Sequence, residues 1–255
     1  MAAIHTGPGD IPQPQQLFAE ARPQNENPKH PLAPVKDPAG PANRHVGKLN
    51  YLKKGKTLGA TGTLFSIGAA FGILCAAHSP LIEIVDGAQI LIDQATFVPA
   101  YNGGGMAEPY GRITVPRKDM WIPSDFRDPA RDDAYDYAVM RVDREQIDQR
   151  LLEGLPQLKV PEPPYNTIQV IGFPVGESAM YYSTGDITEV RPPNICDYDA
   201  STLGGMSGGP LRRLPHFSQI IGVHGGGVGT QPLNRGVLMN RDMIAVIKEW
   251  LERVD

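Results

Sequence analysis

The sequence predicts an all-β protein whose chain ends in a single helix. Short apolar runs bounded by glycine or proline recur along the chain, and helical patterns do not alternate with them. The 28 glycines and 25 prolines favour many short strands joined by turns. With 255 residues, 41% of them hydrophobic, the chain can bury a large core, as one two-lobed domain or two small ones. We therefore expect a barrel or a sandwich.

The expected strands are the stretches with β-branched and apolar alternation, which fall at residues 62–67, 73–76, 89–93, 167–172 and 220–224. A proline-dense stretch, about residues 151–166, predicts the linker between two lobes. No internal repeat is present.

The last residues of the chain carry the one convincing helical pattern. Apolar side chains recur there at steps of three and four residues, with Asn240 as the expected N-cap. The expected apolar face, which should dock on a barrel, consists of Met243, Ile247, Trp250, Leu251 and Val254.

Residues 1–45 differ in composition from the rest. They carry nine prolines, many polar residues and almost no apolar periodicity, so they lack side chains that would offset the entropy of ordering. We expect a disordered tail or a removable pro-segment, followed by a folded domain over residues 46–255.

Composition excludes several function classes. A net charge of −4 and a pI near 5.9, with no basic stripe, argue against nucleic-acid binding, and no apolar run approaches a membrane span. The glycine runs at 103–105 and 225–227 lack the Gly-Lys-Ser/Thr of a phosphate loop, so no nucleotide cofactor is expected.

Cys75 and Cys196 are the only cysteines, so no disulfide framework exists, and no residues are spaced as zinc ligands. We expect a cytoplasmic protein without a metal or other cofactor, while secretion without a disulfide stays open. Oligomeric state is not predicted.

The stretch 202–211, Thr-Leu-Gly-Gly-Met-Ser-Gly-Gly-Pro-Leu, has the form of a nucleophile loop around Ser207. A serine needs a base to take its proton and donors to receive the oxyanion, and glycines let the backbone turn its N–H groups inward. The alternative is a tight hairpin turn.

His78 follows an apolar strand, and Asp136 opens another one. Together with Ser207 they supply a base, an orienting carboxylate and a nucleophile in the order His, Asp, Ser, which is the order of the chymotrypsin type. Each of these three residues taken alone is better interpreted as a structural residue, but the three together favour a catalytic role. Asp132 and Asp133 compete for the acid role, and we choose Asp136 because it adjoins the apolar strand.

These residues resemble the chymotrypsin-fold, trypsin-like serine proteases, and among them the glutamyl endopeptidases. The resemblance spans about 46–255 and is carried by the stretches 76–78, 102–103, 109–111, 136–139, 172–174, 198–210 and 221–224. It implies two six-stranded antiparallel barrels with a C-terminal helix. It also implies an oxyanion hole formed by the backbone N–H groups of Gly205 and Ser207.

The resemblance further implies a specificity pocket for an acidic side chain, built by Thr202 and His224, because a hydroxyl and an imidazole can both donate to a carboxylate. A strand threonine and a core histidine are the structural alternatives. Gly225, Gly226 and Gly227 resemble the edge that pairs with an extended substrate backbone, or form a flexible hairpin.

Three departures from the family matter. Ala60 and Ser79 stand where many relatives carry a disulfide. Met206 replaces the aspartate that pairs with a new N-terminal amine in trypsin-like zymogens, so that route of activation is not expected. In glutamyl endopeptidases the mature N-terminal amine helps to build the pocket, and the stretch before Val46 leaves open whether it is freed here.

The predicted function is a serine endopeptidase that forms an acyl-enzyme and cleaves peptide or protein substrates after Glu or Asp. A dedicated intracellular processing protease is one form of this activity. The rival hypothesis is an inactive protease-like module that binds peptides without cutting them.

Overall fold

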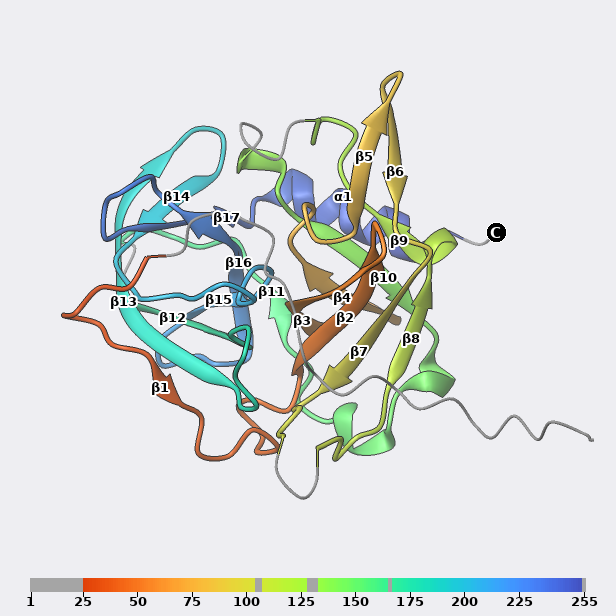
Figure 1. Cartoon of the computed structure of the whole chain (residues 1–255), viewed down its shortest axis with the longest axis horizontal. Helices are drawn as coiled ribbons and strands as arrows, with labels where there is room; N and C mark the ends of the chain where they lie inside the picture. Colours follow the sequence, from red (N-terminus) through yellow and green to blue (C-terminus); the bar gives the residue numbers. More distant parts are fainter. Residues whose placement is uncertain (1–24, 104–106, 128–132, 165–166, 254–255) are drawn as a thin grey trace, which may run out of the picture.

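The computed structural model describes residues 25–103, 107–127, 133–164 and 167–253 as two β-barrels packed side by side (Figure 1). This confirms the predicted all-β class and the pair of barrels. In the described residues no helix is long and apolar enough to cross a membrane.

The first barrel is a sheet whose described strands follow the order β8-β7-β2-β3-β4-β10-β9, which leaves the barrel nearly closed. A separate hairpin, β5 and β6, extends from one end of it (Figure 1). The bounds are β2 (Val46–Lys53), β3 (Lys56–Ile67), β4 (Ala70–Cys75), β5 (Leu81–Val85), β6 (Ala88–Leu91), β7 (Gln94–Pro99), β8 (Ile113–Pro116), β9 (Met120–Trp121) and β10 (Ala138–Val142).

The second barrel closes on itself, because β13 pairs with both β12 and β14 in the ring β13-β12-β15-β16-β17-β14. Its interior is apolar, and Val170, Tyr198 and Leu211 are all fully buried there. The bounds are β12 (Thr167–Gly172), β13 (Tyr181–Arg191), β14 (Ile195–Tyr198), β15 (Pro210–Arg213), β16 (Gln219–Gly227) and β17 (Asn234–Leu238).

The segment between the barrels is partly structured. It contains the 3-10 turns η3 (Arg144–Gln146) and η4 (Gln149–Leu151), and then β11 (Gln157–Leu158), which pairs in parallel with β16. The proline-dense linker therefore adds a short strand to the second barrel. Two further 3-10 turns, η1 (Arg117–Asp119) and η2 (Asp133–Tyr135), precede β9 and β10.

The helix α1 (Arg241–Glu252) lies near the C-terminal end of the described chain. Asn240 caps it as predicted, since its Oδ1 accepts from Met243 N at 2.8 Å. Met243, Ile247 and Leu251 are buried in a cluster with residues of both barrels. The predicted apolar face is therefore confirmed for these residues, while Val254 lies outside the described residues.

Residues 25–35 pack on the second barrel, and residues 39–45 contact Tyr110, Arg212 and the linker, whereas the sequence predicted a tail up to residue 45. The strand β1 (Ala33–Pro34) pairs with β13, and Val35 N donates to Met180 O at 2.8 Å. Main-chain pairing and asparagine contacts hold this segment, so a composition argument that counts only apolar side chains does not detect it. Residues 1–24 lie outside the described residues.

Candidate active site

His78 and Asp136 meet because their strands run antiparallel. Ala138 of β10 lies opposite Cys75 of β4, so Asp136 just before β10 faces His78 just after β4. His78 Nδ1 lies 2.9 Å from Asp136 Oδ2 and 3.0 Å from Oδ1. The backbone N of His78 also donates to Oδ1 at 3.0 Å.

Both groups are nearly buried, with 4% of the His78 side chain and 1% of the Asp136 side chain exposed. In such a setting a carboxylate bound to Nδ1–H holds the imidazole in one orientation and leaves Nε2 as the proton acceptor. The pair therefore has the arrangement that a general base requires.

Ser207 lies in a loop folded tightly against the first barrel. Gly208 has φ +84°, and a Cβ there would lie 2.8 Å from Ala76 N, so only glycine fits. Because Ala76 directly follows β4, this close approach places the loop beside the segment that carries His78. The Ser207 hydroxyl is within 3.3 Å of Gly225 O, and Ser207 is 6% exposed.

The two predicted oxyanion donors belong to peptide groups whose carbonyls are already bonded. Gly204 O accepts from Val175 N at 2.7 Å, and Met206 O accepts from Gly209 N at 2.9 Å. Because C=O and N–H point in opposite directions in a trans peptide, these bonds turn the N–H groups of Gly205 and Ser207 away from those donors. The loop is thereby held in one backbone conformation.

Thr61 is a further loop contact that the sequence did not reveal. From β3, its hydroxyl donates to Gly205 O at 2.9 Å and accepts from Phe173 N at 3.0 Å. Its backbone N donates to Ser207 O at 2.9 Å. A threonine inside a strand carries no sequence signal for this role, because the contact depends on how the two barrels meet.

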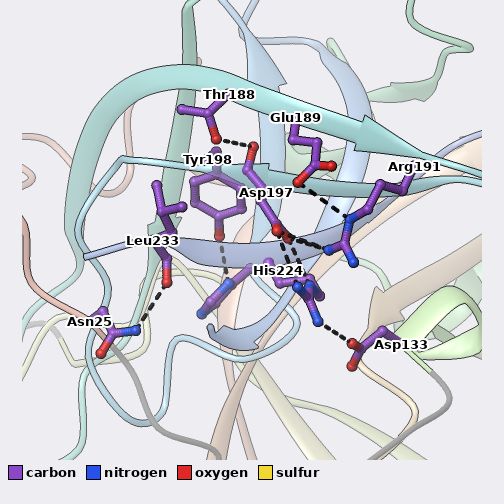
Figure 2. Close-up of polar contacts among 10 residues, drawn as sticks. Asn25, Asp133, Thr188, Glu189, Arg191, Asp197, Tyr198, His224 and Leu233 are labelled. Carbon is purple, nitrogen blue, oxygen red and sulfur yellow. Dashed lines mark hydrogen bonds and ion pairs between the residues drawn. The ribbon is translucent and has the colours of Figure 1, made fainter. Parts of the chain in front are cut away.

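His224 is fully buried on β16, and its Nδ1 lies 2.5 Å from the hydroxyl of Tyr198 on β14 (Figure 2). Burial raises the pKa of the Tyr198 hydroxyl well above its ordinary value. A protonated hydroxyl can both donate and accept, so this contact allows two arrangements of the imidazole protons. When Tyr198 donates to Nδ1, the neutral imidazole carries its proton on Nε2.

Thr202 is also fully buried, but its hydroxyl donates to Asn234 Oδ1 at 2.8 Å. The orientation of the Asn234 amide is set by its neighbours, because its Nδ2 donates to two carbonyls, those of Asn25 and Ala200, each at 2.8 Å. Since a hydroxyl has a single proton, Thr202 directs it to Asn234. The donation from Thr202 to a substrate carboxylate stays a prediction.

Asn234 and the segment around Asn25 are neighbours of Thr202 that the sequence did not reveal. Asn25 O accepts from Thr202 N at 3.2 Å, and Asn25 Nδ2 donates to Leu233 O at 3.0 Å (Figure 2). Asn27 N donates to Ser201 Oγ at 2.6 Å. An N-terminal segment therefore backs the wall that carries Thr202.

Gly225, Gly226 and Gly227 continue β16 beyond His224. The pairing of β15 with β16 reaches Val223, while Gly226 and Gly227 pair with Arg235 and Asn234 of β17. The register of this pairing shifts between His224 and Gly226, so Gly225 lies at a β-bulge or a similar irregularity of the strand.

Of the competing aspartates, Asp133 begins the η2 turn and forms an ion pair with Arg235, whereas Asp136 contacts His78. Asp132 lies outside the described residues. Within the described ranges, no group of three or more His, Cys, Asp or Glu side chains is placed to hold a metal ion.

Residues 114–215 match the trypsin-like peptidase domain family. The matched stretch contains Asp136 and Ser207, and His78 lies before it. Together with the barrel fold, this match supports a serine endopeptidase. No curated protein matches the chain in a sequence search.

Several solved structures share the fold. A protease from Arthrobacter nicotinovorans, Anisep, is 17% identical, covers 87% of this chain and 100% of its own, and gives a TM-score of 0.67. A Glu endopeptidase is 18% identical, with coverages of 87% and 97% and a TM-score of 0.68. An inactivated protease paralogue from the scabies mite is 13% identical, covers 81% and 95%, and gives 0.56. At these identities, the likeness establishes the chymotrypsin fold alone.

Proposed function

We propose that the chain hydrolyses peptide bonds through an acyl-enzyme formed on Ser207. The observation that carries this proposal is the buried pair of His78 and Asp136, at 2.9 Å, beside the tightly folded Ser207 loop. His78 takes the proton of Ser207 and later gives it to the leaving amine, while Asp136 stabilises the imidazolium that forms in between.

The backbone N–H groups of Gly205 and Ser207 are the proposed donors to the oxyanion. The Gly204 and Met206 carbonyl bonds hold both peptide groups in place before substrate binds, so little reorganisation is required during the reaction. Water then attacks the acyl-enzyme with His78 as its base.

The first experiment is labelling with a fluorophosphonate, which reacts with an activated serine. Wild-type protein should label at Ser207, and Ser207→Ala should not label and should lose peptidase activity by a factor on the order of 10⁶. Full activity in Ser207→Ala would remove the proposed nucleophile. A wild-type protein that binds peptide but takes up no label would instead be the inactive binding module.

We further propose that the enzyme cleaves after Glu, and more weakly after Asp. In this proposal the Tyr198 hydroxyl donates to Nδ1 of His224, so the imidazole proton resides on Nε2, where it can donate to the acidic side chain of the substrate. The Glu endopeptidase with the same fold supports this choice. In this assignment Thr202 shapes the wall, and His224 supplies the donor.

Matched peptides with Glu, Gln, Lys or Leu before the scissile bond test this preference. We expect kcat/KM for Glu to exceed that for Leu by roughly a hundredfold, because a pocket donor left without a partner penalises an apolar side chain. His224→Ala should abolish most of this difference, and His216→Ala, on the exposed turn before β16, serves as the matched control. Preference for Lys or Leu would overturn the assignment.

A further inference from the structure

Arg235 of β17 connects the second barrel to the turn that presents Asp136. Its Nη1 donates to Asp133 Oδ2 at 2.7 Å. Its Nε and Nη2 donate to the two oxygens of Asp197 on β14, at 2.7 and 3.1 Å. A two-point contact of this kind fixes the plane of a guanidinium, so Arg235 can hold Asp133 in a defined place.

Asp133 is the first residue of η2, and its carbonyl accepts from Asp136 N at 3.3 Å. The position of Asp133 therefore constrains where the backbone of Asp136 lies, and Asp136 in turn orients His78. This chain of contacts runs from β17 of the second barrel to the base in the first barrel.

The charged side chains involved are largely shielded from water. The exposed fractions are 22% for Arg235, 18% for Asp133 and 6% for Asp197. Figure 2 shows Asp133 on one side of this network and Asp197 with Arg191 on the other. Arg191 shares the Asp197 carboxylate with Arg235, at 2.9 and 3.0 Å, and its other ion pair is with Glu189.

Arg235 of the second barrel holds a segment of the first barrel, and a contact from the first barrel to the second also exists. Thr61 of the first barrel binds Gly205 and Ser207, which belong to the nucleophile loop of the second barrel. Each barrel thus supplies a side chain that holds the catalytic segment of the other one.

We propose that Arg235 is a positioning residue that holds Asp133 and thereby aligns Asp136 and His78 with Ser207. The inference rests on the proposed serine mechanism. It assigns no contact between Arg235 and the substrate, so loss of Arg235 should slow the reaction step more than it weakens binding.

The test is the rate of fluorophosphonate labelling, separated into the maximal rate kinact and the half-saturating concentration KI. Arg235→Met and Asp133→Ala should each lower kinact by about ten- to a hundredfold, since small displacements of catalytic groups have effects of this size. KI should stay within about twofold. Arg235→Lys, which keeps a donor without the two-point geometry, should recover part of kinact.

Arg191→Met is the matched control, because it removes an arginine from the same Asp197 carboxylate and should leave kinact within about twofold of wild type. The double variant Arg235→Met/Asp133→Ala should be no slower than the slower single variant, since both substitutions remove the contact between Arg235 and Asp133. Thermal unfolding of every variant is measured alongside. If Arg235→Met does not fold, Asp133→Ala alone decides the kinact comparison.

Two outcomes overturn the proposal. One is a kinact of Arg235→Met equal to that of Arg191→Met, and the other is a double variant whose loss is the sum of the two single losses. Failure of the serine mechanism itself gives a different result, because wild type would then take up no label at Ser207.

Discussion

At the scale of single residues, neighbouring side chains decide what each polar group can do. Asp133 and Asp136 are three positions apart in the chain, yet one contacts an arginine and the other the histidine. His224 Nδ1 contacts the Tyr198 hydroxyl, and the Thr202 hydroxyl donates a hydrogen bond to Asn234 Oδ1. The donor and acceptor roles of these side chains therefore depend on partners on other strands.

Tyr198→Phe should weaken the selectivity for Glu. Without the hydroxyl, Nδ1 of His224 loses its buried donor, and the proton is no longer held on Nε2. We expect kcat/KM for a Glu peptide to fall by about tenfold, with a smaller change for a Leu peptide. Peptide cleavage assays measure both values.

Tyr110→Phe is the control, because it removes a tyrosine hydroxyl that binds Ala39 O and not the pocket. If Tyr198→Phe and Tyr110→Phe keep the same ratio of Glu to Leu cleavage as wild type, Tyr198 does not set the state of His224.

At the scale of elements, the N-terminal segment and the Ser207 loop are held by main-chain contacts. Residues 25–35 pair with β13 and bond to Ser201, Thr202 and Asn234. In the loop, Met206 is fully buried and its Sδ accepts from Leu203 N at 3.4 Å. A methionine carries no charge, so Met206 cannot form the ion pair with an N-terminal amine that the aspartate of trypsin-like zymogens forms.

Deletion of residues 1–32 should impair cleavage of Glu peptides more than labelling of Ser207. The deletion removes the Asn25 and Asn27 contacts with the pocket wall and leaves the His78–Asp136 pair intact. We expect kcat/KM to fall by roughly tenfold or more, because buried polar groups of Asn234 and Thr202 lose their partners.

Deletion of residues 1–24 is the matched control, since it keeps Asn25 and all the contacts that follow it. Circular dichroism spectra of both shortened chains check that each of them folds. Equal kcat/KM for the two deletions would show that the segment does not support the pocket.

At the scale of the whole molecule, the two barrels and the linker meet at a buried cationic region. Arg212 of β15 is fully buried and donates to Ala42 O at 2.8 Å. His45, next to β2, contacts Leu151 O of the linker turn η4 at 2.8 Å. Burial, with further contributions from Arg44 and Arg212, lowers the pKa of His45 to about 4.

Acid should therefore destabilise the folded protein as the pH falls from about 6.5 towards 4. In this window the unfolded chain protonates His45 and the folded chain does not, so the unfolded state gains protons and stability decreases. His45→Gln keeps an N–H donor for Leu151 O but does not titrate. Between pH 7 and 4.5 the melting temperature of both proteins should fall, and the fall for His45→Gln should be smaller than that for wild type by roughly 5 °C.

The exposed His216→Gln is the comparison for this experiment. A melting temperature that depends on pH equally in wild type and His45→Gln would contradict the assignment to His45.

The sequence by itself determined the all-β class and the capped helix at Asn240, because period-two runs, glycine and proline turns and the N-cap are local signals. The pair of barrels followed only from the resemblance to the chymotrypsin-fold proteases. The sequence also singled out His78, Asp136 and Ser207, since each stands at a strand end in the order typical of the chymotrypsin type. The assignment of their roles stays a prediction until the labelling experiment.

The tertiary structure alone decided which groups contact one another. Thr61, Tyr198, Asn234 and Arg235 carry no local signal, because their hydrogen bonds cross between strands or barrels. The ordering of residues 25–45 depends on the same long-range pairing. Local patterns determine where strands and turns form, while donor and acceptor partners far apart in the chain are fixed only when the barrels close and pack.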